Sequence, residues 1–511
     1  MTSQQSKISI NLNDLLHDFI TDDKFNDITV SGLTLDSRKV NKNDLFIAMK
    51  GESVNGMEFI NHAIEHGASA VLWETGSDVE AIKINWRKTS LKRGELDIAV
   101  PIIAIENLHK ATGELTNVFY AKPSEQLSVC GITGTNGKTS CANFIAQMMS
   151  IDVPCGLMGT LGQGIYPNVT ETGFTTPDVI MCHKWLSDVK ESKAKFAVME
   201  VSSHALSQGR VEGIHFESAV FTNLSRDHLD YHGDMESYAE EKEKLFQVKG
   251  LKNAIINVDD EVGRDIAKHL SQQVRCIRYG TNKNVNPDVY AENIKLDDSG
   301  LSMFVTTPWG KCKLQSPLIG DFNVSNLLAV LSVMLLQNIE FNIAIERLSL
   351  ISSVAGRMQQ FGGQVSPLVV VDFAHTPDAL EQALSSLRQH TKNDLWCVFG
   401  CGGNRDQGKR PLMGAIAEKQ ADFIVLTNDN PRTESADKIL KDIQSGIKNN
   451  ENVVIEQDRH AAIHLAISKA KTGDVVLIAG KGHENYQLIG DTRLPFNDAE
   501  EVKQQLEARV G

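Results

Sequence analysis

A glycine-rich turn behind an apolar run constrains the fold of this chain more than any other feature. The run is 127–130, LSVC, and it leads into 131–140, GITGTNGKTS. A buried strand, a turn with spaced glycines and a Lys-Thr pair opening a helix are suited to nucleotide phosphates, because backbone N–H groups and the helix N-terminus face the anion. The common phosphate-loop pattern has a glycine at the position that is Ile132 in this chain. We therefore expect an ATP-binding loop of a variant kind.

The residues of this loop have separate expected roles. Lys138 is expected to reach the β- and γ-phosphates of ATP, and the hydroxyl of Thr139 or Ser140 to contact Mg²⁺. The predicted phosphate-binding set is Gly134, Thr135, Asn136, Gly137, Lys138, Thr139 and Ser140. The alternative interpretation is a tight strand-to-helix turn without a ligand.

Apolar runs alternate with helix-like stretches along most of the chain, which predicts α/β layers around largely parallel sheets. At 511 residues the chain exceeds what one hydrophobic core supports. Pro123 lies in a linker-like stretch, and a second break falls at 352–356. We predict three domains: an N-terminal α/β substrate domain, a central phosphate-loop ATPase domain with a largely parallel sheet, and a C-terminal Rossmann-like doubly wound domain, at 1–122, 123–348 and 349–511.

Charge and composition exclude several classes of protein. Lys and Arg total 51 against 65 Asp and Glu, a net charge of -14 that repels nucleic acid. No apolar run of membrane-spanning length and no signal-like start occur, so we expect no membrane insertion and a cytoplasmic location. We also expect the chain to act as a monomer. The eight cysteines form no CxxC pair, which predicts reduced thiols.

Acidic and histidine residues follow two expected strands of the central domain. Glu200 comes directly after the strand at 196–199, where a carboxylate can hold a metal ion, although an acidic residue ending a strand is often structural. The segment 223–232 follows the strand at 219–222 and contains two His, two Asp and one Arg. We interpret this density as an Mg²⁺ and phosphate site, with a solvated loop as the alternative.

Three polar turns follow strands of the C-terminal domain. They are 400–411 (GCGGNRDQGKRP), 427–435 (TNDNPRTES) and 479–484 (AGKGHE). The glycines of the first turn do not match G-x-G-x-x-G, which argues against a dehydrogenase. Arginines and lysines in these turns indicate a site for an anionic substrate, namely Arg405, Lys409, Arg410 and Arg432.

Six motifs in order make the chain resemble the Mur ligase family, ATP-dependent enzymes that form amide bonds in bacterial cell-wall synthesis. They are TGTNGKTS, MEVSSHAL, NLSRDHLDYHG, GDFNVSN, AGRMQ and DFAHTPD, and the resemblance covers essentially the whole chain. Within the family, the chain is most similar to the member whose substrates are UDP-N-acetylmuramoyl-L-Ala-D-Glu and meso-2,6-diaminopimelate. The resemblance implies that ATP phosphorylates the D-glutamyl side-chain carboxylate and that an amine then attacks the acyl phosphate.

The resemblance also implies the catalytic and metal-binding residues. Glu200 and His228 would bind Mg²⁺ with help from Thr139, while Lys138 contacts phosphate. A carbamylated lysine (N6-carboxylysine) would sit at Lys242 in MESYAEEKEKLF, and not at Lys244. A free amine with a pKa of about 10.4 is a cation that repels Mg²⁺, whereas a carbamate offers oxygen ligands.

The family pattern further implies three groups of binding residues. For the nucleotide sugar they are Leu35, Ser37, Glu52, Ser53, Val54, Thr175, Thr176, Ser202, Gln208 and Arg210. Phe174 stands where some relatives have Asn, so a polar contact is not expected there. For the base and ribose of ATP they are Asn323, Asn326, Arg357, Asp372 and His375. For the amino acid they are Arg405, Asp429, Asn430, Pro431, Arg432, Gly480 and Glu484.

Arg432 is expected to hold the carboxylate that diaminopimelate has and lysine lacks. The alternatives within the enzyme class are a lysine-adding ligase and a folate-polyglutamate ligase of the same architecture. DNPR at 429–432 argues against the first, and TLDSR at 34–38 argues against the second. A silent nucleotide-binding regulator has no need of Lys138, Glu200, His228 and Lys242 together. A site shared by two domains also implies closure around the substrates.

Overall fold

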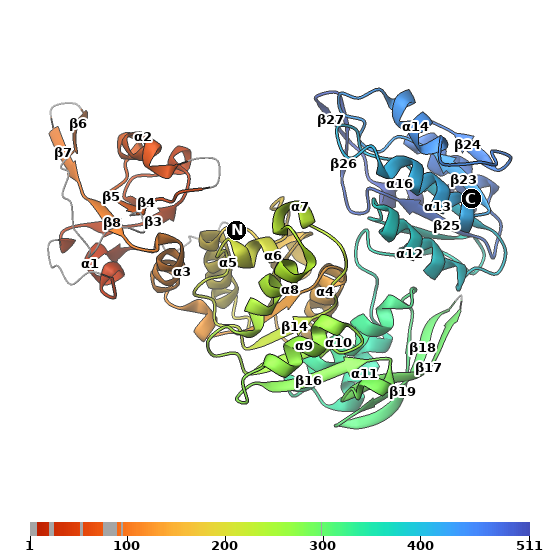
Figure 1. The fold of residues 1–511 in the computed structure, drawn as a ribbon, viewed down its shortest axis with the longest axis horizontal. Coiled ribbons are helices and arrows are strands. Elements are labelled where there is room, and N and C mark those ends of the chain that lie inside the picture. Colours follow the sequence, from red (N-terminus) through yellow and green to blue (C-terminus); the bar gives the residue numbers. More distant parts are fainter. Residues whose placement is uncertain are drawn as a thin grey trace. The chain divides into compact units, whose positions relative to one another are not determined.

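The computed structural model describes residues 8–19, 25–51, 55–74, 89–93, 96–297 and 299–510, and helices alternate with strands along most of it (Figure 1). The chain divides into two compact units. The first comprises Met1–Ala142, Met149–Ile256 and Asp260–Cys276. The second comprises Asn143–Met148, Asn257–Asp259 and Ile277–Gly511.

The N-terminal part of the first unit is built around a parallel sheet with the strand order β3-β4-β5-β8. In β4, Leu45 and Ile47 pack on one face with α1 and α3, while Phe46 and Ala48 pack on the other face with α2. Because both faces of the strand are covered, the four residues of β4 after Asp44 are all apolar. The elements are β1 (Ile10–Asn11), α1 (Leu12–Leu16), β2 (Thr29–Val30), β3 (Gly32–Thr34), β4 (Asp44–Ala48), α2 (Ile60–His66), β5 (Ala70–Glu74), β6 (Thr89–Arg93), β7 (Leu96–Val100), β8 (Ile102–Ile105) and α3 (Leu108–Phe119).

The central part of the first unit carries strands in the order β12-β11-β10-β13-β9-β14-β15. From β10 to β15 the neighbours are parallel, so their carboxyl ends share one edge, where the phosphate loop, Thr160 and Glu200 lie. The elements are β9 (Ser128–Thr133), α4 (Lys138–Met149), β10 (Cys155–Gly159), β11 (Gly162–Ile165), β12 (Asn168–Thr170), α5 (Val179–Glu191), β13 (Phe196–Glu200), α6 (Ser203–Ser207), β14 (Ser218–Phe221), α7 (Leu229–His232), α8 (Met235–Glu243), β15 (Asn253–Asn257) and α9 (Glu261–His269).

The second unit begins with strands in the order β16-β17-β18-β19, of which β17, β18 and β19 pair antiparallel. Long α10 is buried almost throughout, because nearly all of its residues are apolar. The elements are β16 (Arg275–Gly280), β17 (Val289–Asp297), β18 (Gly300–Thr307), β19 (Gly310–Ser316), α10 (Phe322–Leu336) and α11 (Phe341–Ser349).

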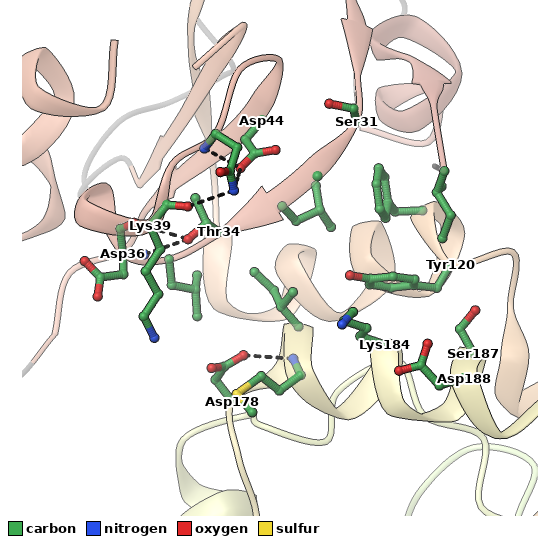
Figure 2. Close-up of a pocket in the computed structure, with 18 of the residues that line it drawn as sticks. Ser31, Thr34, Asp36, Lys39, Asp44, Tyr120, Asp178, Lys184, Ser187 and Asp188 are labelled. Atoms are coloured by element: carbon green, nitrogen blue, oxygen red, sulfur yellow. Dashed lines mark hydrogen bonds between the residues drawn. The ribbon is translucent and has the colours of Figure 1, made fainter. Parts of the chain in front are cut away.

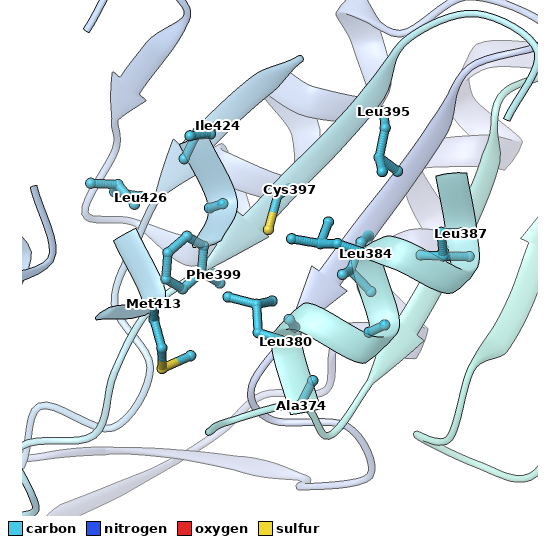
Figure 3. Close-up of a cluster of buried hydrophobic side chains, with 14 of the residues drawn as sticks. Ala374, Leu380, Leu384, Leu387, Leu395, Cys397, Phe399, Met413, Ile424 and Leu426 are labelled. Atoms are coloured by element: carbon cyan, nitrogen blue, oxygen red, sulfur yellow. The ribbon is translucent and has the colours of Figure 1, made fainter. Parts of the chain in front are cut away.

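The second unit ends in a sheet of order β20-β21-β25-β22-β23-β24, parallel except for β20. On one face Cys397 and Phe399 of β22 pack against Leu384 of α12 and Met413 of α13 (Figure 3). On the other face Trp396 and its neighbours pack against α15. Helices on both faces confirm the doubly wound architecture. The elements are β20 (Gln359–Gly362), β21 (Leu368–Asp372), α12 (Pro377–Arg388), β22 (Leu395–Phe399), α13 (Lys409–Gln420), β23 (Phe423–Leu426), α14 (Ala436–Gln444), β24 (Val453–Ile455), α15 (Arg459–Lys469), β25 (Val475–Ala479), β26 (Tyr486–Ile489), β27 (Thr492–Pro495) and α16 (Asp498–Val510).

Two expectations from composition concern the whole chain. Each of the eight cysteines is a free thiol, as the lack of paired spacing predicts. Among the described residues, no helix combines the length and apolarity needed to cross a bilayer.

Candidate active site

The phosphate loop wraps around its own lysine. Gly134 and Gly137 have φ of 145° and 85°, which suit glycine, and a Cβ at Gly134 would lie 1.9 Å from the hydroxyl of Thr222. Lys138, the first residue of α4, donates through Nζ to the carbonyls of Gly134 (2.8 Å) and Thr135 (2.9 Å). The ammonium therefore lies under the turn whose backbone is expected to hold phosphate.

The segment 223–232 fixes the shape of this loop. The side-chain oxygen of Asn223 accepts a hydrogen bond from the backbone N–H of Asn136 (2.9 Å). The backbone carbonyl of Asn223 accepts one from the backbone N–H of Thr135 (2.8 Å). Ser225 donates its backbone N–H to the Thr135 hydroxyl (2.9 Å). The two motifs, about ninety residues apart in the chain, thus form one site at the sheet edge.

Glu200 is buried at the end of β13 and has partners for both oxygens. Oε1 accepts from the backbone N–H of Thr160 (2.8 Å), and Oε2 accepts from the hydroxyls of Thr139 (3.0 Å) and Thr160 (3.3 Å). A Cβ at Gly159 would lie 2.1 Å from Oε1, so this glycine makes room for the carboxylate. Sequence reasoning missed Thr160, although its place directly after β10, the strand beside β13, could have indicated it.

Lys242 is 1% exposed, although α8 around it is strongly polar. Its Nζ donates to the carbonyl of Gly134 (2.9 Å) and lies 4.4 Å from the ring centre of Tyr238. Burial, reinforced by the charge of Lys138, lowers the pKa of Lys242 well below its ordinary value. By contrast, Lys244 is half exposed and pairs with Glu241 at 2.7 Å.

His228 precedes α7 with φ of 53°, and its ring lies 4.9 Å from that of His204. Its Nε2 is 3.5 Å from a carboxylate oxygen of Asp227. Within the described ranges, no three or more His, Cys, Asp or Glu side chains cluster in a way that could hold a metal ion. Glu200, with Thr139 beside it, nevertheless offers the oxygen donors that Mg²⁺ prefers, and a carbamate would add more.

Five of the predicted nucleotide-sugar residues join this site in one hydrogen-bonded cluster. Thr176 donates its hydroxyl to the carbonyl of Glu200 (2.9 Å), and Arg210 donates to the carbonyl of Thr176 (2.8 Å). The remaining members are Thr175, which shares a hydrogen bond with Thr160 (3.0 Å), Ser202, which donates its backbone N–H to Thr176 (3.1 Å), and Gln208, which accepts from Arg210 (2.9 Å). Phe174 nearby is 56% exposed.

The other predicted nucleotide-sugar residues lie in the N-terminal part of the first unit. Leu35 lines a cavity of about 540 Å³ between β3, the end of α3 and α5 (Figure 2). Tyr120, Asp178 and Asp188 face this cavity. Burial is the main cause of a raised pKa of Tyr120, and the negative charges of the two carboxylates raise it further. Ser37 is buried and is not part of the cavity wall. Glu52, Ser53 and Val54 lie outside the described residues.

Of the five predicted base and ribose residues, Asn323 and Asn326 are buried, whereas Arg357 and Asp372 are half-buried and His375 is exposed. Asn323 and Asn326 lie on α10, where Asn326 donates its amide to the Asn323 side chain (2.9 Å). Asp372 accepts from the backbone N–H groups of Met358 (2.8 Å) and Ala374 (2.9 Å). Burial raises the pKa of Asp372 in spite of these bonds.

Arg357 and His375 lie beside the ring of Phe373. The guanidinium of Arg357 is 4.7 Å from the ring centre, and the imidazole of His375 is 4.6 Å from it. Desolvation by the surrounding protein atoms lowers the pKa of His375. His375 also lines the pocket that contains Arg432, so it borders the predicted amino-acid site.

The predicted amino-acid residues surround a cavity of about 380 Å³ in the second unit. Arg432 adopts φ of 53°, and its backbone hydrogen bonds to Leu488 and Gly490 fix the loop against β26. Its guanidinium donates a hydrogen bond to the carbonyl of Gly403 (2.8 Å). Pro431 does not line the cavity. The predicted residues that do are Arg405, Asp429, Asn430, Arg432, Gly480 and Glu484.

Arg410 is not available to an anionic substrate, which corrects the expectation from its motif. It is fully buried, and it pairs with Glu434 (2.7 Å) and Asp442 (2.8 Å). These carboxylates neutralise the guanidinium inside the domain. Arg410 therefore braces the loop that carries Arg432 and does not bind substrate.

Three family models match the chain in succession and define its class. They are "Mur ligase family, catalytic domain" at 29–120, "Mur ligase middle domain" at 132–334 and "Mur ligase, glutamate ligase domain" at 356–482. The chain belongs to the Mur ligase family, a class of ATP-dependent ligases with a three-domain α/β architecture.

The three similar proteins described next share one name, UDP-N-acetylmuramoyl-L-alanyl-D-glutamate–2,6-diaminopimelate ligase. The protein of that name from Coxiella burnetii is 48% identical over 485 residues, covering 94% of this chain and 96% of the relative. That from Chromobacterium violaceum is 44% identical, covering 94% and 95%. A solved structure of a ligase of this name is 36% identical with a TM-score of 0.74, covering 98% of this chain and 100% of that one.

Proposed function

We infer that this chain ligates meso-2,6-diaminopimelate to the D-glutamyl side-chain carboxylate of UDP-N-acetylmuramoyl-L-Ala-D-Glu, converting ATP to ADP and phosphate in peptidoglycan precursor synthesis. Relatives named for this reaction match nearly the whole chain at 44% identity or more. The observation that carries the amino-acid assignment is the pocket in which Arg432 and Glu484 lie together. The reaction would take place in the cytoplasm, where ATP and the nucleotide-linked substrate are found, and the chain would act as a monomer.

The phosphate loop would hold ATP. Backbone N–H groups at the start of α4 would face the phosphates, and Lys138 would leave the carbonyls of Gly134 and Thr135 to contact the β- and γ-phosphates. Mg²⁺ would be held by Thr139, Glu200, His228 and the carbamylated Lys242, and would neutralise charge on the transferring phosphoryl group.

In the first chemical step, an oxygen of the D-glutamyl carboxylate attacks the γ-phosphorus, and the bond from phosphorus to ADP breaks. In the second, the amine attacks the acyl carbon, phosphate leaves with the oxygen it received, and the nitrogen loses a proton. The chain's part is positioning and charge neutralisation. Thr176, which donates its hydroxyl to the Glu200 carbonyl, and Arg210, which donates to the Thr176 carbonyl, would hold the carboxylate end of the nucleotide sugar.

The surroundings of Lys242 support the proposal that it is carbamylated. An amine reacts with CO₂ only when it is unprotonated, and its lowered pKa favours that form. The product is an anionic carbamate with oxygen donors beside Lys138. The modification thus replaces a lysine that would repel Mg²⁺ with a ligand for it.

Selectivity for diaminopimelate over the alternative, L-lysine, is assigned to Arg432. Lysine lacks the second carboxylate, so it would leave the guanidinium without its anionic partner. A charge-assisted hydrogen bond contributes about 1.5–3 kcal/mol, which corresponds to at least roughly tenfold.

The experiment supplies UDP-N-acetylmuramoyl-L-Ala-D-Glu, ATP and Mg²⁺, and measures phosphate release with meso-diaminopimelate, L-lysine or L-glutamate in parallel. We expect release with diaminopimelate at a kcat/KM at least about tenfold above that with lysine. Equal release with lysine would contradict the amino-acid assignment. No release with any of the three would contradict the ligase assignment.

A further inference from the structure

Lys481 is a fully buried lysine directly behind the amino-acid pocket. It lies in the turn after β25 with 0% exposure. Gly480 and Glu484, on either side of it in the chain, line the pocket, whereas Lys481 does not. Since a buried ammonium is unfavourable unless it is paired, its partners indicate what it does there.

The ammonium of Lys481 bonds to two residues that line the pocket. Its Nζ donates to Oε2 of Glu484 (2.8 Å) and to Oδ1 of Asn430 (3.2 Å), and it lies 5.4 Å from the ring centre of Tyr486. Asn430 closes the triangle by donating Nδ2 to the same Oε2 (2.8 Å). The backbone N–H of Leu488 donates to Oδ1 of Asn430 (2.9 Å), which ties the triangle to β26.

This arrangement leaves the two oxygens of Glu484 in different states. Oε2 accepts two hydrogen bonds from behind the pocket. Oε1 accepts none among the contacts of the described residues, and the side chain is 24% exposed. One oxygen is therefore held by the protein, and the other remains for an ammonium group of a ligand.

We propose that Lys481 is a positioning residue of the amino-acid pocket, which fixes Glu484 and Asn430 so that one carboxylate oxygen faces the ammonium of the incoming amino acid. The proposal rests on the proposed function and deepens it. Arg432 would bind the distal carboxylate of the amino acid, and Glu484 would bind an ammonium group of it. The pocket would thus bind both charges of a zwitterionic group. A neutral residue at 481 would let the Glu484 side chain sample other rotamers.

The test is Lys481→Met, which keeps the apolar stem and removes the ammonium. We expect the KM for meso-diaminopimelate to rise at least about tenfold, because one charge-assisted hydrogen bond to Glu484 is lost. The KM values for ATP and for the nucleotide sugar should stay within about twofold, since neither is assigned to this pocket. Ile467→Val, a mild core change on α15 in the same domain, controls for loosened packing and should leave all three KM values unchanged.

A double-mutant cycle separates positioning from a merely structural role. If Lys481 acts through Glu484, then Lys481→Met should add little to the KM for diaminopimelate in a Glu484→Gln background. Fully additive effects, or equal increases in all three KM values, would overturn the proposal. Should Lys481→Met prove unfolded by circular dichroism, Lys481→Gln completes the same cycle under the same criteria.

The same assays distinguish this proposal from the function on which it rests. If the unaltered chain shows no phosphate release that depends on diaminopimelate, the proposed function fails, and the role of Lys481 fails with it. If the unaltered chain is active and Lys481→Met has the same KM for diaminopimelate, only the role of Lys481 fails.

Discussion

Lys242 illustrates how one side chain acquires its chemistry from its surroundings. Its helix is polar, and nothing in the local pattern separates it from Lys244 two residues later. In the structure Lys242 is buried against the carbonyl of Gly134, whereas Lys244 pairs with Glu241 at the surface. The two lysines therefore provide a matched comparison of a proposed metal-site residue with an ordinary one.

Lys242→Ala should lower kcat by about 100-fold or more, because it removes the proposed anionic ligand beside the phosphates. Lys244→Ala should keep kcat within about twofold, since an exposed ion pair contributes little. Phosphate release under saturating substrates measures both. Comparable losses in the two variants would contradict the assignment of Lys242.

Arg432→Ala should raise the KM for meso-diaminopimelate at least about tenfold and bring the kcat/KM for lysine closer to that for diaminopimelate. The KM for ATP should hold, because Arg432 lies in the amino-acid pocket. Arg388→Ala, which removes an exposed arginine paired with Asp422, is the control. A collapse of ATP affinity in Arg432→Ala would show that the pocket is wrongly assigned.

Single residues also mark the limit of what the sequence could predict. Arg432 and Glu484 lie in turns that directly follow strands, so their meeting at one sheet edge was predictable. The burial of Arg410 was not, because its partners Glu434 and Asp442 lie 24 and 32 residues away in the chain. Lys242 was proposed as a metal-site residue only through the family resemblance, since burial by distant segments cannot be recognised in the sequence of a polar helix.

At the scale of elements, the strands beside the site were the most predictable part. The expected strands at 196–199 and 219–222 are β13 and β14, each to within one residue at either end. Strands that are buried on both faces are continuous apolar runs, so they can be recognised in the sequence. The antiparallel strands β17 to β19 were not anticipated, because β17 and β19 are partly exposed and lack such runs.

The link between α13 and the loop that carries Arg432 should weaken in acid. The hydrogen bond from Arg410 lowers the pKa of Glu434 from 4.5 to about 2. Because the pKa is lower in the folded state, this stabilisation is present above about pH 4.5 and is lost as the pH falls toward 2. Urea unfolding at a series of pH values should show a shallower acid decline for Glu434→Gln than for the parent chain.

The control for this prediction is Glu346→Gln, which alters an exposed glutamate of α11. Its unfolding free energy should follow that of the parent chain at each pH. If the unfolding free energy of Glu434→Gln fell with decreasing pH in parallel with that of the parent chain, the ion pair with Arg410 would not be a source of acid sensitivity.

At the scale of the whole molecule, the proposed reaction needs groups from both units. The phosphate loop and Lys242 belong to the first, and Arg432 to the second. Both must act on one set of substrates, so we expect closure on binding. X-ray scattering should show a smaller radius of gyration with the nucleotide sugar and a non-hydrolysable ATP analogue than without them. Unchanged dimensions would argue against closure.

The central claim is that ATP activates the D-glutamyl carboxylate and that diaminopimelate then displaces phosphate. It is tested most directly with UDP-N-acetylmuramoyl-L-Ala-D-Glu labelled with ¹⁸O in both oxygens of that carboxylate, followed by mass spectrometry of the products. The proposed mechanism predicts one ¹⁸O in each released phosphate and a nucleotide product that contains diaminopimelate. Unlabelled phosphate, or phosphate released without that product, would contradict it.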